Sequence, residues 1–148
     1  MNKIPPPENE REQLVRLREA LLTLHKSLVD SERISYEQNI GTIPSATHFL
    51  RLLTDDPWFA WLHPLSQLII ALDQALDART PLTKTVADNL VKQTRLLLVA
   101  TETGETFSRH YFDALQRDPE VIFAHAAAAK IFKANPAGEN LTAENVKI

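Results

Sequence analysis

Residues 8–39 read ENEREQLVRLREALLTLHKSLVDSERISYEQN, and this stretch decides the fold class of the chain. Its leucines alternate between spacings of three and four, which keeps apolar side chains on one face of an α-helix. That row consists of Leu14, Leu17, Leu21, Leu24 and Leu28. A second apolar row lies one step further round and consists of Val15, Leu22, Val29 and Tyr36. We therefore expect one helix, about 48 Å long, with both rows facing a core.

The rest of the chain has the same helical character. Only three glycines occur in 148 residues, and leucine, alanine and long polar side chains are abundant, which favours helices over strands. Prolines, glycines and capping residues divide this part of the chain into segments. We expect further helices over about 44–54, 56–76, 81–103, 105–117 and 118–134, with a break near His63 because Pro64 follows it.

These segments predict an all-α fold, a single-domain bundle of five or six mainly antiparallel helices with a long N-terminal helix. A length of 148 residues suits one domain. Three consecutive prolines make residues 1–7 an extended lead-in. The bundle should cover residues 8–134, and residues 135–148 should form a mobile tail that starts with the helix-stopping sequence NPAG.

Composition excludes several classes of function. The chain has no cysteine, which rules out disulfides and thiolate chemistry. Its net charge of −3 argues against nucleic acid or an anionic membrane as a partner. The apolar runs are far shorter than the roughly 18 residues of a membrane span, and the first residues lack the apolar region of a signal peptide. We expect a soluble, cytoplasmic protein.

A polar stripe lies between the two apolar rows of the first helix. At about 100° per residue, its members are Arg18, His25, Glu32 and Asn39. They need partners, because an unpaired buried polar group costs about 1–3 kcal/mol. Two interpretations stay open. The stripe is either a ladder of polar pairs, with Arg18 or Glu32 in buried ion pairs, or a ligand pocket lined by His25, Glu32 and Tyr36. Glu37 lies on the opposite side, where water solvates it.

A second candidate site surrounds Pro64. This proline lacks the amide hydrogen that would bond to the carbonyl of Ala60, and it disfavours helical geometry at His63. Unsatisfied polar groups would then lie beside Trp61 and the His63 imidazole, and these two residues would form a pocket wall. The alternative is that Pro64 only shapes the helix and that His63 faces solvent.

No motif names a metal, a cofactor or a reaction. The five histidines are His25, His48, His63, His110 and His125. No two of them are three or four residues apart, and no Glu-x-x-His occurs, so the spacings typical of helical metal sites are missing. The chain also lacks Gly-x-Ser-x-Gly and any glycine-rich phosphate loop. We therefore expect no metal, no cofactor and no catalytic residue.

Three strings resemble a family of small, uncharacterised bacterial proteins. They are SERISYE at 31–37, DPWFAWLHPLS at 56–66 and LQRDPEV at 115–121. The resemblance would span about residues 14–132. It implies a bacterial helical protein of the cytoplasm, and it attaches no activity, ligand or site to the chain.

We interpret the chain as a non-catalytic helical binding or protein-interaction module of unknown ligand. The alternative is an enzyme or small-molecule sensor that uses a buried His/Glu pocket. Ile70, Leu96 and Val99 lie off the core rows of their helices, which leaves apolar surface to cover. Closed two-fold pairing is the commonest way to hide such surface, so we expect a homodimer, with an unknown protein or small molecule as a further partner.

Overall fold

The structure is a computed structural model of the chain, and it describes residues 7–79, 81–104 and 106–133. Helices are the only regular secondary structure among these residues, and loops connect them. The elements are α1 (Pro7–Asn39), α2 (Ala46–Asp55), the 3₁₀-helix η1 (Pro57–Leu62), α3 (His63–Ala75), α4 (Lys84–Leu97), α5 (Phe107–Arg117) and α6 (Pro119–Lys133). The predicted all-α single domain is confirmed. The predicted tail, and the predicted lead-in apart from Pro7, lie outside the described residues.

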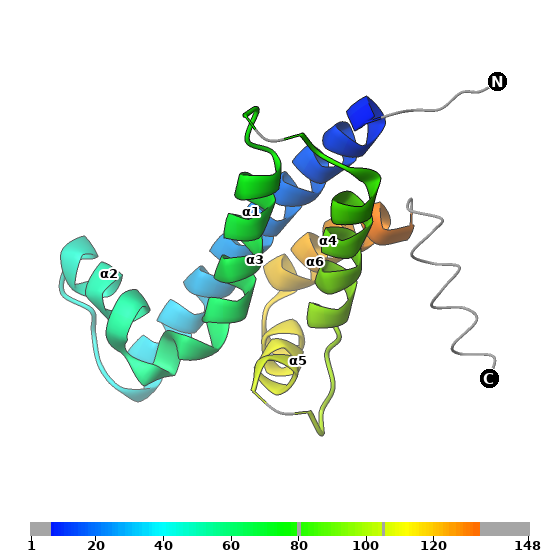
Figure 1. Cartoon of the computed structure of the whole chain (residues 1–148). Helices are drawn as coiled ribbons and strands as arrows, with labels where there is room; N and C mark the ends of the chain where they lie inside the picture. The colour runs from blue at the N-terminus through cyan, green and yellow to red at the C-terminus, as the bar shows by residue number, and fades with distance from the viewer. Residues whose placement is uncertain (1–6, 80, 105, 134–148) are drawn as a thin grey trace.

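The long helix α1 is the central element of the bundle, against which most other helices pack. It runs the length of the molecule in Figure 1, and it packs most extensively against α6, then against α3 and α4. All five leucines of its main apolar row are completely buried, as their spacing predicted. The second row was only partly right as a core row, because Leu22 is exposed while Val29 and Tyr36 pack against the core.

Short polar side chains start the helices where the sequence placed them. In each case a side-chain oxygen accepts a hydrogen bond from a free amide of the first turn, the usual N-cap arrangement. These bonds are Ser45 with the amide of His48 (3.1 Å), Asp56 with Trp58 (2.8 Å), Thr83 with Val86 (3.1 Å) and Asp118 with Glu120 (3.0 Å). Local sequence therefore sets where α2, η1, α4 and α6 begin.

The predicted break at Pro64 is present, but it leaves no free carbonyl. The 3₁₀-helix η1 ends at Leu62 and α3 begins at His63. The amide of His63 donates to the carbonyl of Ala60, the acceptor that the sequence analysis left unpaired. The tighter turn of a 3₁₀-helix shifts the donor by one residue, and this shift corrects our expectation of an unsatisfied carbonyl beside His63.

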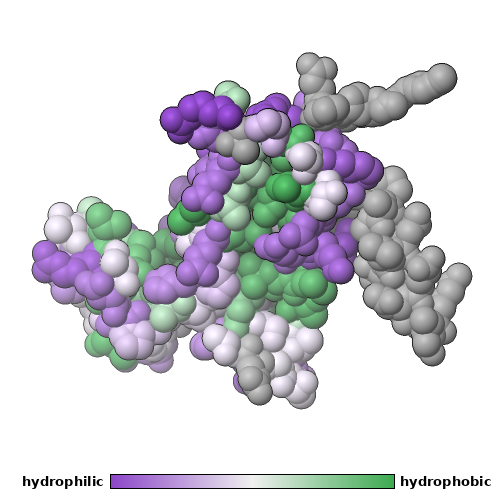
Figure 2. All heavy atoms as spheres, viewed as in Figure 1, coloured by the Kyte–Doolittle hydropathy of each residue, from purple (hydrophilic) through white to green (hydrophobic). Residues whose placement is uncertain are grey.

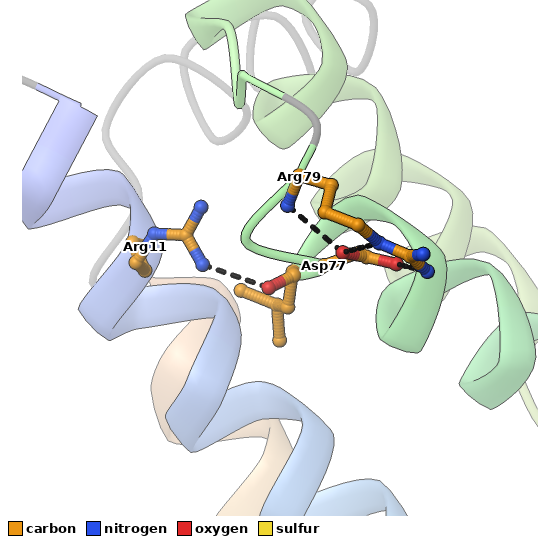
Figure 3. A network of polar contacts seen from close by, with 4 residues as sticks. Arg11, Asp77 and Arg79 are labelled. Carbon is orange, nitrogen blue, oxygen red and sulfur yellow. Dashed lines mark hydrogen bonds and ion pairs between the residues drawn. The ribbon is translucent and has the colours of Figure 1, made fainter.

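A polar contact fastens the start of α1 to the end of α3 (Figure 3). The guanidinium of Arg11 donates from Nη1 to the carbonyl of Leu76 at 2.9 Å. Leu76 is the C-cap of α3, where free carbonyls and the negative end of the helix dipole favour a cation. In the loop that follows, Asp77 and Arg79 form an exposed ion pair with a separation of 2.9 Å.

Helix α6 buries a different face from the one expected. At 3.6 residues per turn, the apolar residues Ile122, Ala126, Ala129 and Phe132 share one side of this helix, and the sequence pattern alone predicts that this side is buried. The structure buries Val121, Ala124 and Ala128, whereas Ile122 and Ala126 are exposed. The side chain of Phe132 lies outside the described residues. The error has a physical source, since α6 is apolar around most of its circumference and its sequence does not mark the inner face.

Candidate functional site

Each member of the polar stripe on α1 has its own partner. Arg18 forms an ion pair through Nε with the Oδ1 atom of Asp73 on α3. Both side chains are more than a third exposed, so this pair lies at the rim of the bundle. At the end of α1, Asn39 donates to the carbonyl of Ser35 in its own helix at 2.8 Å. Neither residue lies in a buried ligand site.

His25 faces α3 and shares a hydrogen bond with Ser66. The distance between His25 Nε2 and Ser66 Oγ is 2.9 Å, and burial lowers the pKa of His25 below its usual value. In nucleophilic catalysis, a neutral imidazole acts as the base that activates a hydroxyl, and a third group orients the imidazole. Within the described residues, however, no carboxylate contacts the second ring nitrogen to orient the base. The pair satisfies two polar groups between α1 and α3.

Glu32 is the most buried charged residue of the stripe, and α5 holds it. Its Oε2 atom accepts a hydrogen bond from Nη2 of Arg117 at 2.8 Å. The same guanidinium donates to the hydroxyl of Ser31 from Nε at 3.0 Å and from Nη2 at 2.9 Å. The exposed fraction of the Glu32 side chain is 9%, against 37% for Arg117. Arg117 therefore bridges the buried face of α1 and the solvent.

Tyr36 belongs to an aromatic cluster that joins α1, α2 and η1. Its ring lies edge-on to Trp58, at a centroid distance of 5.6 Å and an angle of 88°, and contacts Phe59 at 5.6 Å. Phe49 of α2 meets Phe59 at 5.7 Å. Edge-to-face contacts of this kind stabilise packing. They give Tyr36 a structural environment in place of the pocket wall considered above.

Trp61 and His63 are neighbours in sequence, yet their side chains have different environments. Trp61 is buried, with its ring stacked on His110 at 5.2 Å and against Phe107 at 5.3 Å. The indole N–H groups of Trp58 and Trp61 are buried, and neither has a hydrogen-bond partner among the described residues. His63, the first residue of α3, is exposed. It thus follows the alternative in which Pro64 shapes the chain and the imidazole faces solvent.

Two hollows lie elsewhere on the bundle. The first, of about 260 Å³, separates α3 from α4 and is lined by Pro64, Gln67, Leu68, Ala71, Gln93 and Leu97. The second, of about 470 Å³, lies along α6 beside α1 and is lined by Arg16, Phe123, Ala126, Ala127, Lys130 and Ile131. We call them the α3–α4 face and the α6 groove.

The six predicted site residues lie outside both hollows. They are Arg18, His25, Glu32, Tyr36, Trp61 and His63. In the described part of the chain, no hydrogen bond, ion pair or ring contact joins one of the six to another. The structure distributes them over separate contacts of α1, α2, α3 and α5.

Sequence reasoning missed both hollows. The α3–α4 face depends on how two helices lie side by side, which periodicity does not give. The sequence did contain an indication of the α6 groove. Because α6 is apolar around most of its circumference, part of its apolar surface must point away from the core. The partners Asp73, Ser66 and Arg117 carried no signal, because each is more than 40 residues from its partner on α1.

Comparison with known proteins found no match to this chain among family models, curated proteins or solved structures. The structure identifies the chain as a small all-helical protein, and no family assignment follows. None of the helices in residues 7–79, 81–104 and 106–133 is long and apolar enough to cross a membrane. In the same ranges, no group of three or more His, Asp or Glu side chains is placed to hold a metal ion.

Proposed function

We propose that this protein is a non-catalytic interaction module that pairs with a second copy of itself through the α3–α4 face. The observation that carries the proposal is the chemistry of that face. Its six lining residues include no charged side chain. In Figure 2 an apolar strip follows the groove between α3 and α4. Leu96 and Val86 lie three residues after and seven residues before Gln93, which places them on the same side of α4, and they extend the face as apolar residues with exposed fractions of 63% and 44%.

A second copy suits this face better than a charged partner does. A two-fold interface places one patch against the same patch of the partner, so a patch whose charges all share one sign repels itself. The α3–α4 face avoids that repulsion because it is uncharged, as the centres of protein interfaces usually are. Gln67 and Gln93 offer amide donors and acceptors that can pair across the two-fold axis.

The contacts of the polar stripe also support an interaction module over an enzyme or sensor. Glu32 is engaged by Arg117, and His25 by Ser66. A side chain that already has a partner must break that contact before it can bind substrate or transfer a proton. Ile70, Leu96 and Val99, the apolar residues whose positions lie off the core rows of their helices, are all exposed.

Sedimentation equilibrium at micromolar concentration tests the proposal. We expect twice the chain mass of 16.7 kDa for the unmodified protein and the single-chain mass for Leu96→Glu. Ile34→Glu is the matched control, because Ile34 is also an exposed apolar residue but lies on α1, and this variant should stay dimeric. An unmodified protein of 16.7 kDa overturns the dimer. A dimer that survives Leu96→Glu places the interface elsewhere and overturns the α3–α4 face.

A further inference from the structure

We propose that the α6 groove is a docking site for an acidic amphipathic helix of another protein. This interaction is separate from self-association, since the groove shares no lining residue with the α3–α4 face. The inference rests on three observations about α6 and its neighbour α1: an apolar face that no described residue covers, a spacing that fits a helix, and two cations that have no partner among the described residues.

The outward face of α6 is largely apolar, and none of residues 7–79, 81–104 and 106–133 covers it. The inner face, with Val121 and Ala128 completely buried, packs on α1. On the outer side, Phe123 is 69% exposed and Ile122 is 47% exposed. A helix that is apolar all round is normally buried on every side. In the described part of the chain nothing covers these two side chains, so the outer face is suited to a partner.

The spacing of the groove residues on α6 fits another helix. Phe123, Ala126, Ala127, Lys130 and Ile131 follow the pattern i, i+3, i+4, i+7 and i+8. Residues in this pattern form one continuous stripe over two turns, and a second helix contacts such a stripe along its length. The two alanines in the middle allow the axes to approach to about 8 Å, the lower end of the usual range.

The charges of the groove specify an acidic partner. Arg16 and Lys130 are both exposed, and neither forms a hydrogen bond or ion pair with the described chain. By contrast Arg18, only two residues from Arg16, is paired with Asp73. The lining of the groove therefore carries two cations and no carboxylate, and neither cation is paired within the described chain. Carboxylates on the flanks of a docked helix would pair with them.

The same charges argue against a second copy as the occupant. Two-fold pairing through the α6 groove would bring two copies of Arg16 and two of Lys130 into one interface. With no anion among the lining residues to compensate them, four cations in one interface oppose association. The uncharged α3–α4 face has no such penalty. The two hollows thus differ in the kind of partner they fit.

Fluorescence anisotropy with a labelled synthetic peptide tests the proposal on the full chain. The probe is a 15-residue helical peptide with leucines in an i, i+3, i+4, i+7 stripe and glutamates on both flanks, and the control peptide carries lysine at each glutamate position. We expect the acidic peptide to bind with a micromolar Kd that weakens as salt is raised, and to bind at least tenfold more tightly than the basic one.

Variants of the groove assign the binding to it. Lys130→Glu should weaken the acidic peptide at least tenfold and strengthen the basic peptide, and Phe123→Ala should weaken the acidic peptide at least tenfold. The matched control is Lys92→Glu, because Lys92 is an exposed lysine of α4 outside the groove, and it should leave binding within twofold. A gain of basic-peptide binding in Lys130→Glu is an effect that misfolding does not produce.

Four results would overturn the proposal: no binding of the acidic peptide, equal binding of both peptides, equal losses in Lys130→Glu and Lys92→Glu, or a change in the mass of peptide-free protein on Lys130→Glu. The last result would identify the groove as a contact between copies. Leu96→Glu separates this proposal from the proposed function, since it should abolish the dimer while peptide binding stays intact.

Discussion

Glu32 on α1 and Arg117 on α5 meet at 2.8 Å although 85 residues separate them in sequence. Arg117 also donates twice to Ser31, so one guanidinium serves two neighbouring residues of α1. The Glu32 carboxylate is almost fully buried, and Arg117 is its only partner in the described chain. This contact joins the second half of the long helix to the C-terminal helices.

Removing the Glu32 carboxylate should destabilise the fold. In Glu32→Ala the guanidinium of Arg117 loses its charged acceptor, and we expect the free energy of unfolding to fall by about 1–3 kcal/mol. The loss should be smaller than the one expected for breaking a fully buried ion pair, because Arg117 is partly exposed and water can solvate its charge. The shift of the urea midpoint measures the effect. Glu19→Ala, at an exposed position of α1, should cost less than about 0.5 kcal/mol, and equal shifts would contradict the prediction.

Glu37 has a structural role that the helical wheel did not predict. Its Oε2 atom accepts a hydrogen bond from the amide of Ile43 at 2.9 Å, so the expectation that water alone solvates it was wrong. The wheel describes the helix and not the chain beyond it, which turns back toward Glu37. We expect Glu37→Ala to lower the free energy of unfolding by about 0.5–1.5 kcal/mol, measured by urea denaturation. A midpoint as unchanged as that of Glu19→Ala would contradict this role.

The rotation of α6 can be tested with two adjacent residues. Val121 is completely buried, so Val121→Ala removes two methyl groups from the core and should cost about 1.5–3 kcal/mol in unfolding free energy. Ile122 is 47% exposed, and Ile122→Ala should cost less than about 1 kcal/mol. Urea denaturation of the two variants gives the comparison. If Ile122→Ala were the more costly change, α6 would be turned as the sequence first indicated, and the α6 groove would not face outward.

The contrast between α1 and α6 shows when the periodicity of apolar residues predicts which face of a helix is buried. In α1, the charged residues Glu12, Glu19, Lys26 and Asp30 occupy the side opposite the main leucine row, so the sequence identified the face of that row correctly. In α6, alanines and other apolar residues occupy most positions. Several rotations then bury similar areas, and packing against α1 decides among them.

The N-caps and the partners of the polar stripe show which polar contacts the sequence can predict and which it cannot. A cap such as Asp56 bonds to an amide two residues away, so sequence alone predicts it. The partners of Arg18, His25 and Glu32 lie 55, 41 and 85 residues away. Their identity depends on which helices become neighbours and in what register. The sequence predicted that the stripe needs partners and not which residues supply them.

The contact between Arg11 and α3 should contribute modestly to stability. Arg11→Gln removes the charged donor from the carbonyl of Leu76, and we expect a loss of about 0.5–1.5 kcal/mol in unfolding free energy. Arg16→Gln is the matched control, because Arg16 is an exposed arginine of the same helix without a partner in the described chain. Thermal or urea unfolding measures both variants, and an equal loss in the two would show that the contact contributes nothing.

Two partly buried histidines should make the fold sensitive to mild acid. His125 Nδ1 shares a hydrogen bond of 2.7 Å with the hydroxyl of Tyr111, and His25 Nε2 shares one of 2.9 Å with Ser66. Burial lowers the pKa of both histidines below the usual value of about 6.5 and raises the pKa of Tyr111. In each pair the folded state favours the neutral imidazole.

The direction of the pH effect follows from these lowered pKa values. Below pH ~6.5 the two histidines are protonated in the unfolded chain but remain neutral in the folded chain. The stability that is present above pH ~6.5 is therefore lost as the pH falls toward and through the folded-state pKa values. Each histidine contributes a slope of at most about 1.4 kcal/mol per pH unit. Urea unfolding between pH 7.5 and 5 should show the decline in the unmodified protein and a flatter profile in the double variant His25→Asn/His125→Asn. The variant retains the exposed His48, His63 and His110, so an identical decline in both proteins would assign the acid sensitivity to other groups.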